Sequence, residues 1–172
     1  MKGKLIDSMI RVDHAGEYAA VCIYHGQEIA LKDTDDAKQI SEMRDHELVH
    51  FRYFDNKLKE CRVRPTVFMP VWHTMAVSLG YVTALMGKEA AMACTEAVEE
   101  VICEHYDEQI AQLKRYGCGE EIIGTIKKFR DDEQEHMDIA AKGGADNAIG
   151  YTVLTSVVKV ACRIGIAVSK VL

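Results

Sequence analysis

The sequence predicts an all-α protein formed by one domain over residues 1–172, and three observations support this. Its only prolines, Pro65 and Pro70, lie close together and far from either end of the chain. Long stretches rich in Ala, Glu, Lys, Met and Ile surround them, and these residues favour helices. With 48% hydrophobic and 28% charged residues, the composition is that of a globular domain that buries its own core.

Turn-forming residues set the limits of the first two helices. Residues 5–31 are expected to form the first helix, beginning near Asp7 or Ser8. The polar run 32–36 then supplies a turn and the capping side chains of a second helix over 34–60.

Proline and glycine divide the rest of the chain into four further helices. A third, apolar helix is expected over 70–86, and Gly87 separates it from a fourth over 88–116. Two glycines precede a fifth helix over 120–142, and a glycine-rich turn precedes a sixth over 150–172.

Charge and cysteine usage narrow the classes of function. The chain has 21 Lys and Arg against 27 Asp and Glu, a net charge of −6, which excludes a general nucleic-acid binder. Its six cysteines include no C-x-x-C pair, and the N-terminus shows neither a secretory signal nor a transit peptide. We therefore expect reduced cysteines in a reducing compartment.

Two Glu-x-x-His motifs stand out in the predicted second and fifth helices. Glu47 and His50 form the first, and Glu133 and His136 form the second. Each motif places a carboxylate and an imidazole three residues apart on one helix face. One such motif arises easily by chance in a charged helix, but two copies in corresponding helices are informative.

Each motif has a partner glutamate across a predicted helical hairpin. Glu17 and Glu47 are equidistant from the turn at position 32, and Glu99 and Glu133 are equidistant from the turn at position 116. Antiparallel helices therefore bring a glutamate level with each motif, and the second hairpin repeats the first 82 to 86 residues later.

Together these residues resemble the ligand pattern of ferritin-like di-iron and di-manganese carboxylate proteins. The predicted fold is a ferritin-like four-helix bundle of helices one, two, four and five, with the third as a crossover helix and the sixth as an added C-terminal helix. Carboxylates with one imidazole per metal suit iron or manganese. The predicted ligands of the two metal ions are Glu17, Glu47, His50, Glu99, Glu133 and His136.

Longer motifs resemble the demethoxyubiquinone hydroxylases over nearly the whole chain. The matching segments are RVDHAGEY (11–18), IYHGQ (23–27), AVEE (97–100) with the pair His105-Tyr106, and KFRDDE (128–133) with Glu135-His136. The resemblance implies a di-iron monooxygenase that uses dioxygen to hydroxylate a polyprenyl methoxy-benzoquinol in ubiquinone biosynthesis. It also implies the same six iron ligands.

The resemblance further implies an enzyme bound peripherally to a membrane, on the cytoplasmic face of a bacterial inner membrane or the matrix face of the mitochondrial inner membrane. Its expected partners are the quinol, dioxygen, the membrane surface and an electron donor that the sequence does not identify. The chain could form a homo-oligomer or join a biosynthetic complex.

Several residues near the ligands are candidates for supporting roles. Tyr106 lies two turns after Glu99 and is expected to act, with His105, as a catalytic hydrogen-bonding group; a core tyrosine is the alternative. Asp13 and Asp132 could each orient a ligand histidine, or be exposed acids. No role is expected for four histidines outside the repeat, His14, His25, His46 and His73.

Two apolar segments outside the bundle indicate contact with a membrane. Residues 66–87 contain no Asp, Glu, Lys or Arg, yet a single crossing there would separate the two halves of the site. In the sixth helix, Lys159, Arg163 and Lys170 lie within about 40° of one another on a helical projection. Apolar residues lie opposite them: Leu154, Val157, Ala161, Ile164 and Val168. This pattern is typical of an interfacial helix, although a helix docked on the bundle would show it too.

Two other functions are open at this point. One is a ferritin-like or rubrerythrin-like protein that oxidises iron or scavenges peroxide with the same ligands. The absence of a C-x-x-C pair and the two apolar helices speak against it. The other is a non-catalytic quinone-binding subunit in which the acids hold no metal.

Overall fold

The computed structural model describes residues 2–117 and 119–170, and within them it contains six α-helices and one short 3-10 helix but no strand. The helices are α1 (Lys2–Leu31), α2 (Ala37–Cys61), α3 (Met69–Leu85), α4 (Lys88–Tyr116), α5 (Glu120–Lys142), η1 (Ala145–Asn147) and α6 (Tyr151–Ser169). The all-α prediction is confirmed. Residues 171–172, the end of the predicted last helix, lie outside the described residues, and so does Cys118.

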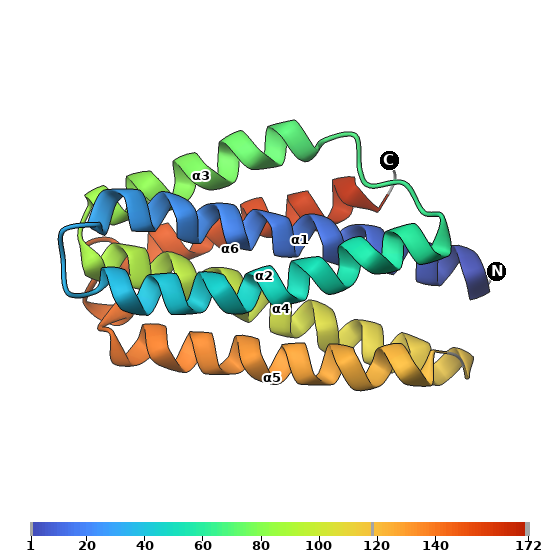
Figure 1. The fold of residues 1–172 in the computed structure, drawn as a ribbon. Coiled ribbons are helices and arrows are strands. Elements are labelled where there is room, and N and C mark those ends of the chain that lie inside the picture. Colours follow the sequence, from blue (N-terminus) through green and yellow to red (C-terminus); the bar gives the residue numbers. More distant parts are fainter. Residues whose placement is uncertain (1, 118, 171–172) are drawn as a thin grey trace.

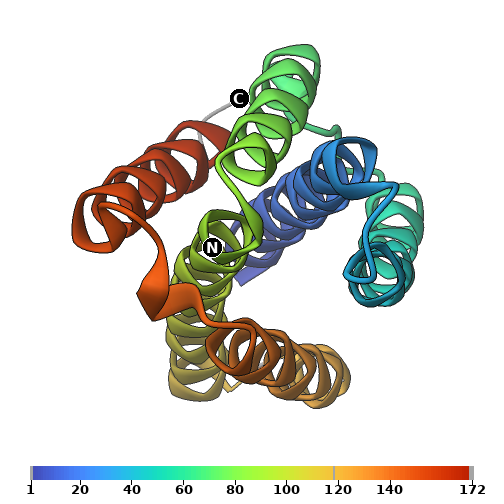
Figure 2. The same cartoon turned by 90° about the vertical axis from the view of Figure 1, so that its left-hand side faces the viewer.

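Four long helices, α1, α2, α4 and α5, run side by side, and α3 and α6 lie outside them (Figure 1). Seen along the bundle, α3 and α6 cover the α1 and α4 side, away from α2 and α5 (Figure 2). This is the predicted bundle, with α3 as the crossover and α6 as the added helix.

Helix boundaries agree with the predictions where glycine forms the turn. α4 and α5 have the predicted limits, and Gly117 ends α4 in the left-handed region at φ 58°. Two predicted starts are wrong. α1 begins at Lys2, well before Asp7, and α2 begins only at Ala37. The hydroxyl of Thr34 donates instead to the Leu31 carbonyl, so it stabilises the end of α1 rather than capping α2.

Two apolar clusters fill the bundle on either side of its middle. One contains Tyr24, Ile40, Met43 and the alanine-rich start of α4. The other contains Phe54, Phe129 and aliphatic residues from the opposite ends of the same helices. These clusters exclude water from both sides of the level at which the predicted ligands lie.

α1 and α3 approach so closely that their backbones touch at two glycines. A Cβ atom on Gly80 would lie 1.9 Å from the Ile23 carbonyl oxygen, and one on Gly26 would lie 2.2 Å from that of Val77. Only glycine permits this approach, which holds the crossover helix against the bundle.

A cavity of about 540 Å³ lies between α1, α3, α4 and α6, with an almost entirely apolar lining. α3 contributes Met75, Leu79 and Val82, and α6 contributes Ala161 and Ile166. The cavity therefore lies beneath α3 and α6, the two helices outside the bundle. Among the described helices, α6 is the one with the length and composition needed to cross a membrane.

Candidate metal centre

All six predicted ligands meet in the middle of the bundle, where each side chain is at most 3% exposed. Their ligand atoms form two groups within which every atom lies within 4.8 Å of the others. The first group is Glu17, Glu47, His50 and Glu133; the second is Glu47, Glu99, Glu133 and His136. Because Glu47 and Glu133 belong to both groups, the cluster has two adjoining positions for a cation.

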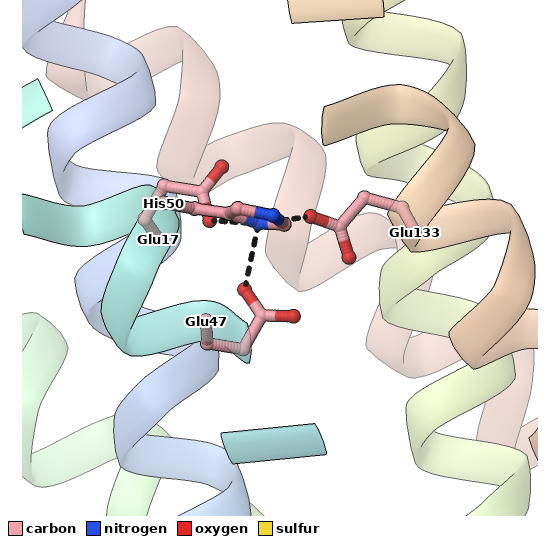
Figure 3. Close-up of side chains that lie close together, drawn as sticks. All are labelled: Glu17, Glu47, His50 and Glu133. Atoms are coloured by element: carbon pink, nitrogen blue, oxygen red, sulfur yellow. Dashed lines mark ion pairs between the residues drawn. The ribbon is translucent and has the colours of Figure 1, made fainter. Parts of the chain in front are cut away.

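His50 is the centre of the first group (Figure 3). Its Nδ1 lies 2.9 Å from Glu133 Oε1, 3.5 Å from Glu17 Oε2 and 3.8 Å from Glu47 Oε2. Three helices thus direct carboxylates at one imidazole nitrogen, so α1, α2 and α5 must keep this relative placement for the site to exist.

His136 has the same place in the second group. Its Nδ1 lies 3.0 Å from Glu47 Oε1 and 3.1 Å from Glu133 Oε2. Both histidines therefore present Nδ1 to the carboxylates and leave Nε2 to face outward.

The four buried carboxylates hold protons unequally. Burial, followed by repulsion from Glu133, raises the pKa values of Glu47 and Glu99 well above their ordinary value. Burial would also raise the pKa of Glu133, but hydrogen bonds with His136 and His50 lower it to about 2. Although burial opposes it, pairing with Glu133 and Glu17 raises the pKa of His50 to about 11. Negative charge in this cluster is therefore only partly balanced by the histidines.

This donor set fits a pair of metal cations. Both oxygens of Glu47, Oε2 of Glu99 and Oε1 of Glu133 lack a well-oriented hydrogen-bond donor among the described residues. Buried carboxylate oxygens without donors are costly, and bound cations would satisfy them. Four carboxylates with two imidazoles match the preferences of iron and manganese.

Two buried tyrosines hold the outer glutamates in a reciprocal arrangement. The Tyr24 hydroxyl on α1 donates to Glu99 Oε1 on α4 at 2.7 Å, and the Tyr106 hydroxyl on α4 donates to Glu17 on α1. Each tyrosine follows its own helix's glutamate by seven residues. The same 82-residue repeat that relates Glu17 to Glu99 also relates Tyr24 to Tyr106, so the repeat is the signal in the sequence that identifies Tyr24, for which no role was predicted.

The other candidate residues lie around the cluster. Asp132 was expected to orient a ligand histidine one turn along its own helix, but its Oδ2 lies 3.0 Å from Nε2 of His50 on α2. Asp132 therefore contacts a ligand histidine of the other hairpin. Asp13, by contrast, is buried and reaches no ligand histidine: its Oδ1 lies 3.3 Å from Nε2 of His105 and accepts a hydrogen bond from Gln109. His105 is buried one residue from Tyr106 and contacts this Asp13 group.

Of the four histidines given no role, His46 alone among those with described contacts reaches a predicted ligand. Its Nδ1 lies 3.3 Å from Nε2 of His136. His14 lies near Asp55, His25 near Glu28, and His73 against the Tyr18 hydroxyl.

We expect the metal-free protein to lose stability as the pH rises from 5 to 8. The folded-state pKa values of Glu47 and Glu99 exceed the unfolded value of 4.5. The destabilisation of the folded protein by these two carboxyl groups is therefore absent below pH 4.5 and grows as the pH rises. Stability from His50 is complete below 6.5 and is lost as the pH rises toward 11. Glu133 acts in the opposite sense only below pH 4.5.

Thermal melts with chelator and with added metal at each pH would check this. Metal binding requires deprotonated carboxylates, so the stabilisation by metal should increase with pH. The double variant Glu47→Gln, Glu99→Gln should flatten the metal-free profile. A metal-free melting temperature that rises from pH 5 to 8 in the parent protein would contradict the expectation.

A family model described as ubiquinone biosynthesis protein COQ7 matches residues 4–169 of the chain. Similar proteins carry hydroxylase names. A Dictyostelium discoideum protein named NADPH-dependent 3-demethoxyubiquinone 3-hydroxylase, mitochondrial, is 47% identical over 170 residues, covering 98% of this chain and 78% of the relative.

Two further relatives come from distant organisms. A Homo sapiens protein of the same name is 46% identical, covering 96% of this chain and 77% of the relative. A Rhodospirillum rubrum protein named 3-demethoxyubiquinol 3-hydroxylase is 41% identical, covering 96% of this chain and 78% of the relative.

Proposed function

This chain belongs to the ubiquinone biosynthesis protein COQ7 family. We propose that its six clustered residues bind two iron ions and that the protein uses this centre to hydroxylate a polyprenyl methoxy-benzoquinol. The chain is a hydroxylating oxidoreductase of ubiquinone biosynthesis, as its relatives are named. The hydroxylase names do not favour the ferritin-like and non-catalytic alternatives.

The observation that carries the proposal is the overlap of the two ligand groups at Glu47 and Glu133. A carboxylate in both groups can bridge two cations, whereas a site for one cation needs no second group. Bridging carboxylates also offset the mutual repulsion of two adjacent cations.

Anaerobic reconstitution with Fe²⁺ followed by metal analysis tests this proposal. We expect close to two iron ions per chain and magnetic coupling between them. Glu133→Gln removes one member of both groups, so it should lower the bound iron below two. One iron per parent chain, or uncoupled iron, would contradict the paired site.

In the proposed reaction, residues around the cluster hold the metal ligands in place and exclude water. Bound iron supplies the activation of dioxygen, of which one oxygen atom enters the quinol ring and the other leaves as water. Tyr24 and Tyr106 hold Glu99 and Glu17 by hydrogen bonds, and burial raises the pKa of both phenols well above 10, so they stay donors. The apolar clusters on either side exclude water.

Tyr106 and His105 are proposed to act next to the metals rather than as ligands. Tyr106 donates a hydrogen bond to Glu17, so it would position that carboxylate to hold a metal ion. His105 contacts Asp13 and Gln109 and reaches the cluster only through its neighbour Tyr106. We assign His105 a supporting role in holding this part of α4 and α1 together.

The apolar cavity is the proposed route of the quinol. Its lining includes Gly16 and Val98, which directly precede the ligands Glu17 and Glu99, so the cavity and the ligands lie on adjacent faces of α1 and α4 at the same level of the bundle. An apolar lining suits a polyprenyl chain, and a space of about 540 Å³ falls within the usual range for ligand sites.

The outer face of α6 is proposed to lie on a membrane. Val153, Val157, Val160 and Ile164 are each more than half exposed on it. The predicted apolar set requires two corrections, because Leu154 packs against two core clusters and Ala161 lines the apolar cavity. A peripheral position on one side of the bilayer keeps the ligand-bearing helices out of the lipid.

The basic stripe of α6 also differs from the prediction. Lys159 Nζ lies 2.6 Å from Glu100 Oε2, and an Arg163 guanidinium nitrogen lies 3.0 Å from Glu104 Oε2. These cations pair with α4, which reduces the charge available to anionic lipid.

We expect Val157→Gln with Ile164→Gln to weaken liposome binding about 10-fold or more, because each side chain loses roughly 1 kcal/mol of apolar burial in the lipid. Binding of the parent should largely persist at high salt, since its main cations are paired. Liposome flotation would measure both effects. Val49→Gln, an equally exposed valine on α2, is the matched control and should bind as the parent does.

The remaining partners follow from the chemistry and the relatives' names. Hydroxylation with dioxygen needs two electrons, and the Dictyostelium and human relatives are named NADPH-dependent, so we propose NADPH as their source. Those relatives are also named mitochondrial. The proposed place of this chain is the matrix face of a mitochondrial inner membrane or the cytoplasmic face of a bacterial one, alone as a homo-oligomer or within a biosynthetic complex.

A further inference from the structure

The residue before each motif glutamate contacts the ligand histidine of the other hairpin. Asp132, just before the ligand glutamate of α5, has Oδ2 3.0 Å from Nε2 of His50. His46, just before the ligand glutamate of α2, has Nδ1 3.3 Å from Nε2 of His136. The His46 and His136 rings also stack, with centroids 5.5 Å and planes 21° apart. The two contacts are related by the same internal repeat as the ligands themselves.

The geometry of His136 gives this contact a chemical consequence. Its Nδ1 faces Glu47 Oε1 at 3.0 Å, so Nδ1 is the nitrogen available to a metal ion. A neutral histidine bound through Nδ1 carries its proton on Nε2. The group that accepts this proton fixes the orientation of the ring and tunes the strength of the ligand.

We propose that His46 is a positioning residue for His136, accepting the Nε2 proton and making the two ligand histidines unequal. The two ligand histidines are unequal because Nε2 of His136 contacts the imidazole of His46, whereas Nε2 of His50 contacts the carboxylate of Asp132. A carboxylate acceptor increases the basicity of the donor ring more than an uncharged acceptor does. His50, backed by Asp132, is therefore the stronger ligand. This inference rests on the proposed metal centre.

The metal-free protein labelled with ¹⁵N-histidine provides the first test. His46→Leu should shift the Nε2 resonance of His136, because its contact with Nδ1 of His46 is lost. His46→Asp should return the resonance toward a hydrogen-bonded position, since Asp132 makes the equivalent contact from the equivalent place. His25→Leu is the matched control, an exposed helix histidine that lies near Glu28, and it should leave the His136 resonance unchanged.

Titration with Co²⁺, an oxygen-stable substitute for ferrous iron, provides the second test. His46→Leu should weaken binding at one of the two positions by about 10-fold or more, and His46→Asp should restore it. The inference is overturned if His46→Leu leaves either the His136 resonance or the Co²⁺ affinity at the value of the His25→Leu control. Failure of the parent protein to bind Co²⁺ at all would instead overturn the metal centre, and the resonance of the metal-free protein would still decide whether His46 positions His136.

Discussion

Glu133→Gln is expected to abolish turnover and destabilise the metal-free protein, whereas Glu99→Gln should abolish turnover but stabilise it. Turnover should fall by more than about 100-fold in both variants. Mutating a residue that only hydrogen-bonds a metal ligand usually lowers activity by about 10- to 100-fold, and loss of a ligand itself should cost more. Glu133 pairs with both buried histidines, and removing one partner of a buried ion pair costs roughly 3–5 kcal/mol. Glu99 instead repels the neighbouring carboxylates, which contributes to its raised pKa. Removing this repulsion should stabilise the folded protein by about 1.4 kcal/mol for each unit by which the pKa is raised.

Denaturant unfolding with chelator near pH 7.5, together with quinol turnover of the iron-loaded protein, would measure both effects. Glutamine preserves side-chain volume and leaves Tyr24 an acceptor at position 99. Glu135→Gln, at an exposed position on α5, is the control and should change neither quantity. Retained turnover in either ligand variant would exclude that residue as an essential ligand, and stability changes of the same sign would contradict the charge distribution described above.

Gly80→Ala should destabilise the protein and lower turnover of long-tailed quinol. Its new methyl group would meet the Ile23 carbonyl oxygen at 1.9 Å, so α3 must move away from α1. Overpacking of this kind costs about 1–3 kcal/mol, more than the gain of roughly 1 kcal/mol from replacing a helical glycine with alanine. Movement of α3 also distorts the cavity that we assign to the polyprenyl chain.

Gly124→Ala is the matched control for this substitution. Gly124 is also inside a helix, but a Cβ atom there would meet nothing within 4 Å. Its alanine variant should therefore be slightly more stable than the parent protein. Thermal melts and turnover with short-tailed and long-tailed quinols would compare the two. If Gly80→Ala is as stable as Gly124→Ala, the helices are not held by direct backbone contact.

The sequence alone predicted much of the fold because its information there is local. Glycine turns placed both ends of α4 and α5, since the left-handed conformation at Gly117 belongs to that residue itself. The start of α2 was less predictable because several polar residues of the turn could cap it, and Thr34 instead bonds back to α1.

The candidate ligands were equally predictable, although their metal-binding role is a proposal. A three-residue spacing puts Glu47 and His50 on one helix face whatever the helix packs against. Equal distances from a turn then bring Glu17 level with Glu47, because antiparallel helices rise equally per residue. These are properties of position along the chain.

Only the tertiary structure decided which side chains meet across helices that are distant in sequence. Contacts such as Tyr24 with Glu99, Asp132 with His50 and His46 with His136 depend on how far each helix is rotated about its own axis. The same rotation turns Leu154 into the core and leaves Val157 exposed, although both lie on the apolar side of one helical projection. Helix rotation is set by the summed packing of all neighbouring helices, which no local pattern of residues contains.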